Sequence, residues 1–239
     1  MHIRSLRFLP DTYPSKDCYP FSLEVFRKTE ELLFLHPVTF FAGENGTGKS
    51  TLLRAIARAS GIHIWEEREG TRDRHNLFED KLGESIAIER TNGKVPGSFF
   101  ASESFRHFAE VLDAWGIADP GCLGYFGDTS LVAKSHGQSH MAFFEHRFTR
   151  RGLYLLDEPE NALSPRRQLE LLRLLRRFAA RDDVQFIIAT HSPILLALPG
   201  AMIYSFDKSP IREICYEDTE YFNVFRDFLN NRERYLDGL

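Results

Sequence analysis

The spacing of hydrophobic positions changes along this chain from alternating to helical to continuous. Two weakly alternating runs, Ile3–Phe8 and Phe21–Phe26, predict a pair of antiparallel strands near the start. A short apolar run begins at Val38, after Pro37, and apolar residues then recur at helical spacing up to Gly61. The first part of the chain therefore predicts antiparallel strands that lead into a strand, a loop and a helix.

The middle of the chain predicts a mainly helical segment. Alternation over Ser85–Glu89 and the turn dipeptide Asn92-Gly93 predict a hairpin with the strand that follows. Apolar side chains recur at helical spacing from Phe105 to Trp115, and we expect another helix after Gly137. These helices should form a lobe, at about residues 100–150, inserted between the two halves of one sheet.

The second half of the chain alternates buried strands with helices. Apolar runs at residues 152–156 and 184–190 are typical of parallel strands that are covered on both faces. Between them, Ser164 and Pro165 provide the cap and the first residue of a helix. We also expect closing strands at residues 201–206 and 211–216, and an amphipathic helix over residues 219–229. Residues 1–239 thus predict a single α/β domain with a mainly parallel sheet flanked by helices.

Composition narrows the class of protein. A chain of 239 residues that is 43% hydrophobic can bury a full core, and its net charge of −4 gives no overall attraction to nucleic acid. Cys18, Cys122 and Cys215 form no metal-binding or disulfide pattern, which favours a reducing cytoplasm. The start of the chain lacks a secretory signal pattern, and no apolar run approaches the ~20 residues that a membrane-spanning helix needs.

The loop after the first buried strand carries the strongest chemical signal. It reads Gly-Glu-Asn-Gly-Thr-Gly-Lys-Ser-Thr and fits the pattern G-x-x-x-x-G-K-[ST], between a strand and a helix as that motif requires. Glycines let the backbone wrap around phosphate oxygens, and the amides at the helix start point at the anion. The residues expected to bind nucleotide here are Gly43, Glu44, Asn45, Gly46, Thr47, Gly48, Lys49, Ser50 and Thr51. We assign Lys49 to the β- and γ-phosphates and Ser50 to Mg²⁺.

A carboxylate pair ends the next buried strand. Asp157 should hold Mg²⁺, directly or through water, because this hard cation prefers oxygen ligands. Glu158 can accept the proton of the attacking water, a catalytic role that is worth about 10²–10⁴-fold in rate. The two motifs together predict a Mg²⁺-dependent enzyme that hydrolyses a nucleotide.

Four motifs in this order resemble those of ABC-type ATPases. Residues 157–163, Asp-Glu-Pro-Glu-Asn-Ala-Leu, resemble the Walker B motif and D-loop, and Thr190-His191-Ser192 resembles the switch-histidine loop. Ser135-His136-Gly137-Gln138-Ser139 lies just upstream, where this family places its signature. The whole chain is similar to small stand-alone bacterial ATPases that are classed with the AAA family but built like ABC and chromosome-maintenance heads. The resemblance implies a P-loop NTPase fold of the ABC type.

The resemblance also implies a dimer that forms around ATP. In that family two heads sandwich the nucleotide, so Ser135, Gly137 and Gln138 of one copy would face the ATP that the other copy binds. His191 would act in catalysis by contacting the γ-phosphate held in its own chain, and residues 161–164 would line the dimer seam.

Two departures from the family pattern concern individual residues. His136 replaces the first glycine of the usual signature, and the chain lacks the family's glutamine loop. Glu103 is the nearest polar candidate for the contact with metal or water that this glutamine would make. A zinc site at His136, His140 and His146 is disfavoured, because the spacing does not match a zinc motif.

Several functions stay open at this point. Beside an ATPase that drives a protein partner, the chain could be a slow nucleotide-gated switch or the ATP-binding subunit of a transporter. The arginine-rich helix that begins at Pro165 leaves contact with nucleic acid open, although such a charge run is usually a solvated face. Tyr13 and Tyr19 could stack on adenine or pack in a turn. The sequence identifies neither the partner nor the process.

Overall fold

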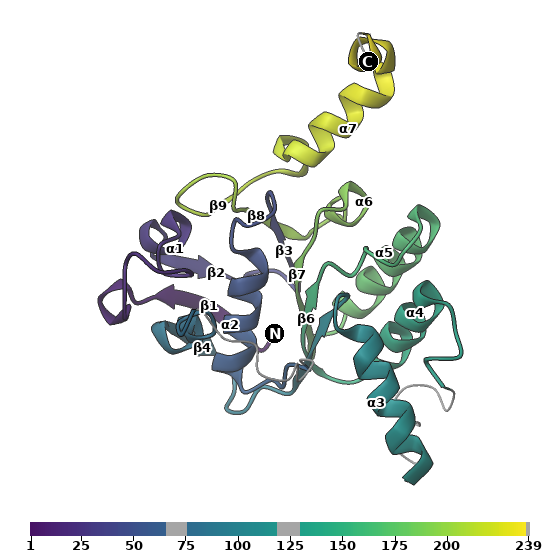
Figure 1. Ribbon diagram of the computed structural model, residues 1–239, viewed down its shortest axis with the longest axis horizontal. Helices are drawn as coiled ribbons and strands as arrows, with labels where there is room; N and C mark the ends of the chain where they lie inside the picture. The colour runs from purple at the N-terminus through teal and green to yellow at the C-terminus, as the bar shows by residue number, and fades with distance from the viewer. Residues whose placement is uncertain (66–75, 119–129, 238–239) are drawn as a thin grey trace.

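A six-stranded sheet forms the centre of the molecule (Figure 1). The computed structural model describes residues 1–65, 76–118 and 130–237. The strands lie in the order β5-β6-β7-β3-β8-β9; the first five are parallel, and β9 is antiparallel to β8. Their bounds are β5 Gly97–Ala101, β6 Gly152–Asp157, β7 Val184–Ala189, β3 Val38–Ala42, β8 Met202–Ser205 and β9 Arg212–Glu213. The expected α/β fold with a mainly parallel sheet is confirmed.

A smaller antiparallel sheet packs beside the first one. It has the order β2-β1-β4, with bounds β1 Ile3–Phe8, β2 Glu31–Leu33 and β4 Ile86–Arg90. The predicted strand at Phe21–Phe26 is wrong, because the segment forms a turn followed by helix α1 (Glu24–Lys28), with Phe21 and Phe26 both buried in the core. The spacing of apolar residues in this segment fits a helical turn rather than a strand.

The hairpin predicted at Asn92-Gly93 is also wrong. β4 pairs with β1, whereas β5 pairs with β6 in the other sheet. The connection between β4 and β5 therefore crosses from one sheet to the other. Pairing with partners far away in sequence overrode the local turn signal.

Helices fill the space between the two sheets and cover the outer face of the large sheet (Figure 1). α2 (Lys49–Ser60) lies between the sheets and ends at Gly61, whose φ of 72° is left-handed as a helix C-cap prefers. The other face carries α3 Phe105–Ala118, α4 His136–Arg147, α5 Pro165–Ala179 and α6 Pro193–Leu196. The expected end of α2 at Gly61 and the expected start of α5 at Ser164 and Pro165 are both confirmed.

Alternate residues of the central strands feed two separate cores. In β3, Phe41 joins the core around α2 and the antiparallel sheet, while Phe40 joins the core under α3, α4 and α5. Aromatic rings dominate the second core, where Phe143, Phe144 and Phe148 are buried. Part of the segment expected as a helical lobe, residues 119–129, lies outside the described residues.

The last two helices leave the body of the molecule. α7 (Glu220–Asn230) starts close to the sheet and projects away from it, and α8 (Arg232–Leu236) follows at its far end (Figure 1). The expected amphipathic helix near residues 219–229 is confirmed, with the Thr219 side chain accepting a hydrogen bond from the N–H of Phe222. Within the described ranges, no helix combines the length and the apolar character needed to cross a membrane.

Close backbone approach at the start of β5 generates a test of the fold. A Cβ added to Gly97 would lie 2.2 Å from the carbonyl oxygen of Leu153 and 2.7 Å from Cδ1 of Ile62. The Leu153 oxygen belongs to the neighbouring strand and cannot move without breaking the ladder. We expect Gly97→Ala to lower the free energy of unfolding by about 1–3 kcal/mol in urea denaturation.

Gly93→Ala provides the matched control for this substitution. A Cβ at Gly93 meets no atom within 4 Å among the described residues. We expect its effect to stay within about 0.5 kcal/mol. Equal effects of the two substitutions would contradict the assigned register between β5 and β6.

Candidate active site

The loop between β3 and α2 has the backbone shape of an anion cradle. The backbone φ values of Gly43, Gly46 and Gly48 are 146°, 79° and 103°. Residues with a Cβ atom rarely adopt such values, because the Cβ would clash with the backbone. Gly48 is also constrained by packing, because an added Cβ would lie 2.7 Å from Cζ of Phe26. Asp207, which is not part of the loop, holds it in place: its Oδ1 accepts a hydrogen bond of 2.8 Å from the N–H of Glu44. Asn45 and Gly46 are exposed at its tip.

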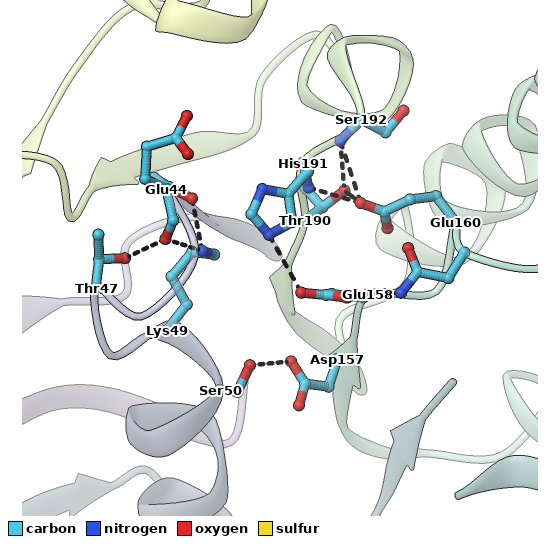
Figure 2. A network of polar contacts seen from close by, with 12 residues as sticks. Glu44, Thr47, Lys49, Ser50, Asp157, Glu158, Glu160, Thr190, His191 and Ser192 are labelled. Atoms are coloured by element: carbon cyan, nitrogen blue, oxygen red, sulfur yellow. Dashed lines mark hydrogen bonds and ion pairs between the residues drawn. The ribbon is translucent and has the colours of Figure 1, made fainter. Parts of the chain in front are cut away.

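Lys49 is buried beneath this loop (Figure 2). Its Nζ donates hydrogen bonds to the carbonyl oxygens of Gly43, at 2.5 Å, and Glu44, at 2.8 Å. Burial lowers the pKa of Lys49, and nearby carboxylates, first Glu158 and then Asp207, partly oppose this effect. The ammonium group therefore donates to neutral carbonyls, and the nearby carboxylates balance its positive charge only in part. A phosphate group would be attracted to this charge.

Ser50 and Asp157 meet at the carboxyl edge of the sheet (Figure 2). The Ser50 hydroxyl donates a hydrogen bond of 2.7 Å to Oδ1 of Asp157. Burial raises the pKa of Asp157 from 3.8 to about 6, although the bond from Ser50 and the charge of Arg54 act in the opposite direction. A buried carboxylate beside a hydroxyl presents the two oxygen ligands that Mg²⁺ prefers.

Glu158 stands at the end of β6 in an unusual backbone conformation. Its φ of 48° lies in the left-handed region, which costs a residue with a side chain of order 1–3 kcal/mol. Oε1 lies 3.1 Å from Nε2 of His191, and Oε2 accepts a hydrogen bond of 2.6 Å from Nδ2 of Asn161. The turn thus aims the carboxylate at His191 and fixes it from two sides, while Asp157 faces Ser50.

Tyr221 was not recognised from the sequence, yet it joins two parts of the site. Its hydroxyl contacts Nδ1 of His191 and also donates to the carbonyl oxygen of Gly43 at 2.9 Å. Burial, and next the charge of Lys49, lower the pKa of His191, which favours the neutral ring. The tautomer with hydrogen on Nε2 donates to Glu158, and the single Tyr221 proton then has two acceptors, Nδ1 of His191 and the Gly43 carbonyl.

Glu160 is a second residue whose role the motif did not reveal. Its Oε1 accepts hydrogen bonds from Oγ1 of Thr190 and N–H of His191, both at 2.6 Å, and from N–H of Ser192 at 3.1 Å (Figure 2). Burial raises the pKa of Glu160, and the hydrogen bonds from Thr190 and His191 oppose that shift. One carboxylate oxygen therefore ties the loop after β6 to the loop after β7 and fixes the position of His191.

The signature residues lie at the start of α4. Ser135 is the N-cap, and its N–H donates a hydrogen bond of 3.1 Å to Oε1 of Gln138. Gly137 packs against the loop after β6, because an added Cβ would lie 2.8 Å from the carbonyl oxygen of Ala162. Ser135 and Gln138 are exposed, and in the described part of the chain neither forms a hydrogen bond with residues 43–51. The structure thus brings Lys49, Ser50, Asp157, Glu158 and His191 together but does not add the signature to them.

Glu103 lies just beyond the same edge of the sheet. It is exposed, two residues after Ala101, which pairs with Asp157 in the ladder. The described residues contain no group of three or more His, Cys, Asp or Glu side chains placed to hold a metal ion. His140, which the sequence places near His136, is buried edge-on against the rings of Phe100 and Phe105, and burial lowers its pKa to about 4.

The two tyrosines considered for adenine have different surroundings. Tyr13 packs against Phe21 and donates a hydrogen bond of 2.8 Å to the carbonyl oxygen of Phe26, so it stabilises a turn. Tyr19 is partly exposed, and its hydroxyl contacts Oγ1 of Thr51 in the first turn of α2. Of these two tyrosines, Tyr19 is the one that lies next to the phosphate-binding loop.

A phosphate loop, a strand-end carboxylate pair and a histidine in the loop after the neighbouring strand define a P-loop nucleotide hydrolase. The chain is 31% identical over 169 residues to the thiamine import ATP-binding protein ThiQ of Cereibacter sphaeroides, covering 63% of this chain and 69% of that protein. It is 27% identical over 179 residues to the phosphonates import ATP-binding protein PhnC of Bordetella parapertussis, covering 64% and 70%. The chain belongs to the ABC-type family of ATPases.

A family model matches part of the chain, and a solved structure shares its fold. Residues 132–197 match the family model described as "AAA domain, putative AbiEii toxin, Type IV TA system". The structure of cbiO1 from Clostridium perfringens, part of the ABC transporter complex cbiONQ, aligns with a TM-score of 0.56 and 17% identity over 100% of this chain and 99% of that one. The expected resemblance to small P-loop ATPases of the ABC type is confirmed, and the chain is an ATPase.

The raised pKa of Asp157 predicts how one substitution changes stability. Because the pKa is about 6 in the folded chain and 3.8 in the reference state, ionising Asp157 costs folding free energy as pH rises through that interval. We expect Asp157→Asn to increase the free energy of unfolding of the nucleotide-free chain by about 1–3 kcal/mol at pH 8. The gain should shrink at pH 5 and vanish below about pH 4.

Urea denaturation at pH 8 and pH 5 measures this effect. Asp17→Asn serves as the control, because it removes the same charge at an exposed position and leaves the buried carboxylate in place. A gain for Asp157→Asn that is independent of pH would show that its cause is not the titration of this carboxylate.

Proposed function

We propose that two copies of this chain close around ATP and Mg²⁺ and that the cycle of closing and opening drives a protein partner. The observation that carries the proposal is the separation of the signature from the rest of the site. Ser135 and Gln138 are exposed on α4, whereas the loop residues, Asp157, Glu158 and His191 converge in one chain. A second copy would supply the missing donors.

Lys49 and Ser50 would change partners when ATP binds. The phosphate oxygens would replace the Gly43 and Glu44 carbonyls as acceptors for Lys49, which relieves its poorly compensated charge. Ser50 and Asp157 would release their mutual hydrogen bond and hold Mg²⁺, which neutralises charge on the β- and γ-phosphates. Glu103 is a further candidate for metal or water contact at this edge.

Glu158 would act as the general base. A water molecule attacks the γ-phosphorus, the bond to the bridging oxygen breaks, ADP leaves, and Glu158 accepts the proton of the water. Asn161 and His191 hold the carboxylate for this step. His191 would also contact the γ-phosphate, and its link to Glu160 would carry that contact to the loop after β6.

The signature would complete the site from the other chain. Ser135 and Gly137 would donate hydrogen bonds to the γ-phosphate, with the positive end of α4 behind them and Gln138 shaping the turn. We propose residues 1–239 as one domain in which the lobe at about residues 100–150 carries this signature. Gly137 packs against Ala162, so the lobe and the loop after β6 would move together.

Two other functions have specific support. The names of the relatives ThiQ and PhnC favour the ATP-binding subunit of an importer, which would work in the cytoplasm on a membrane partner. The family model, named for a putative toxin, favours a nucleotide-gated switch with slow hydrolysis in a defence or nucleic-acid complex. Marked stimulation of turnover by a membrane partner or by DNA would identify the class of partner.

Glu158→Gln tests the proposed base. We expect turnover to fall by about 10²–10⁴-fold while ATP stays bound and an ATP-bound dimer accumulates. Glu145→Gln, on the exposed face of α4, should leave turnover unchanged, and Lys49→Ala should abolish ATP binding. Steady-state phosphate release and light scattering measure these effects; wild-type turnover in Glu158→Gln would contradict the assignment of the base.

Mixing two inactive variants tests whether the signature works in the other chain. Lys49→Ala mixed with Ser135→Arg forms heterodimers with one intact composite site, so roughly a quarter of wild-type activity should return in an equal mixture. Lys49→Ala mixed with Glu158→Gln is the control, because each of these changes damages the loop side of its own chain and neither site is intact. Restoration in both mixtures, or in neither, would contradict the proposed arrangement.

A further inference from the structure

The C-terminal helices start at the active site and end far from it. The first turn of α7 is anchored by Tyr221, whose hydroxyl contacts His191 and donates to the carbonyl oxygen of Gly43 at 2.9 Å. Beyond this turn α7 and α8 extend away from the sheets (Figure 1). We call residues 220–236 the C-terminal arm.

The C-terminal arm exposes an apolar stripe. None of the residues of α7 or α8 is buried, although six of their side chains are large and hydrophobic and are 37% to 74% exposed. These residues are Val224, Phe225, Phe228, Leu229, Tyr235 and Leu236. Those in α7 recur at a spacing of three to four residues, so they lie on one side of the helix. A stripe of this kind is normally covered by another surface.

The base of the arm indicates which surface covers it. Tyr221 lies against Gly43 and His191, the two loops that would face the signature of a second copy across bound ATP. The arm therefore rises from the face that the proposed dimer covers. In a twofold dimer, each arm would meet the same surface on the other copy.

An exposed apolar side chain lies close to the signature in sequence. Val132 precedes Ser135 by three residues and is 46% exposed. Leu169 on α5 is also exposed, but it lies two positions from Arg167, the residue against Gly137, and therefore points to another side of that helix. A second copy thus presents Val132 beside the segment that would approach Gly43.

We propose that the C-terminal arm packs on a second copy of the chain, beside its signature, when ATP closes the dimer. This inference rests on the proposed function, since it requires that dimer. Tyr221 is the positioning residue of the arm: its hydroxyl joins the first turn of α7 to the phosphate loop and to His191. A change at either loop on nucleotide binding is thus passed directly to the start of the arm.

Serine substitutions in the stripe test the packing. In a Glu158→Gln background, Phe225→Ser combined with Leu229→Ser removes two exposed side chains that contribute nothing to the core of the single chain. We expect the dissociation constant of the dimer at saturating ATP to rise by at least about tenfold, because these side chains would be central to the contact. Light scattering over a series of protein concentrations measures it.

Leu77→Ser in the same background is the matched control. Leu77 is 76% exposed and does not belong to the arm, so its replacement should change the dissociation constant by less than about twofold. ATP binding by single chains and circular dichroism should match the parent in both variants. A dimer equally tight in the Phe225→Ser/Leu229→Ser variant and in its parent would overturn the inference.

Tyr221→Phe tests the connection to the site. It keeps the ring and removes the hydroxyl that contacts His191 and Gly43. We expect weaker ATP-dependent dimerisation, measured at an ATP concentration that saturates the single chain of this variant. Unchanged dimerisation would remove Tyr221 from the proposal.

The same experiment separates this inference from the proposed function. If the parent Glu158→Gln chain stays monomeric with ATP, the proposed dimer and the arm contact both fail. If the parent dimerises and the arm variants dimerise equally well, the dimer stands and only the arm contact fails.

Discussion

A lysine ammonium without a full counter-charge is the interaction on which this site depends. Lys49 is buried and is held by two main-chain carbonyls of its own loop, while the nearest carboxylates oppose its loss of charge only in part. Asp157 accepts a hydrogen bond from Ser50, the residue after Lys49, and burial also disfavours its charged form, raising its pKa to about 6. Each group is less stable in its charged form than it would be in water. In the proposed function, an anion with a divalent cation placed between them would reduce both costs, as ATP with Mg²⁺ would.

The sheet order explains why these groups meet. β6, β7 and β3 are adjacent and parallel, so the residues that follow them, Glu158, His191 and the phosphate loop, emerge at one edge. Glu160 then joins the loops after β6 and β7 through a single carboxylate oxygen. The left-handed backbone of Glu158 and the buried charges nearby cost stability, as is usual where a site is built for function. The buried cores on both faces of the sheet supply the stability that maintains this strained edge.

Sequence reasoning predicted the geometry correctly where a few consecutive residues determine it. The phosphate loop, the carboxylate pair and the caps of α2 and α5 are each contained in a few consecutive residues, and the loop glycines are required by backbone geometry alone. It failed at Phe21–Phe26 and Asn92-Gly93, where partners distant in sequence decided between helix, hairpin and crossover. The sequence around Tyr221 contains no motif, and Tyr221 lies thirty positions after His191. Its contact with His191 is therefore visible only in the fold. Glu160 lay inside a recognised motif, but only the fold shows that it accepts three hydrogen bonds.

The central claim is that a complete site needs two chains, and the rate of ATP hydrolysis per chain tests it most directly. We would measure this rate at saturating ATP and Mg²⁺ over a wide range of protein concentrations. A composite site predicts a rate per chain that rises with concentration and then reaches a plateau, since only dimers turn over. A measurable rate per chain that stays constant down to the most dilute sample, where light scattering finds monomers, would contradict the account.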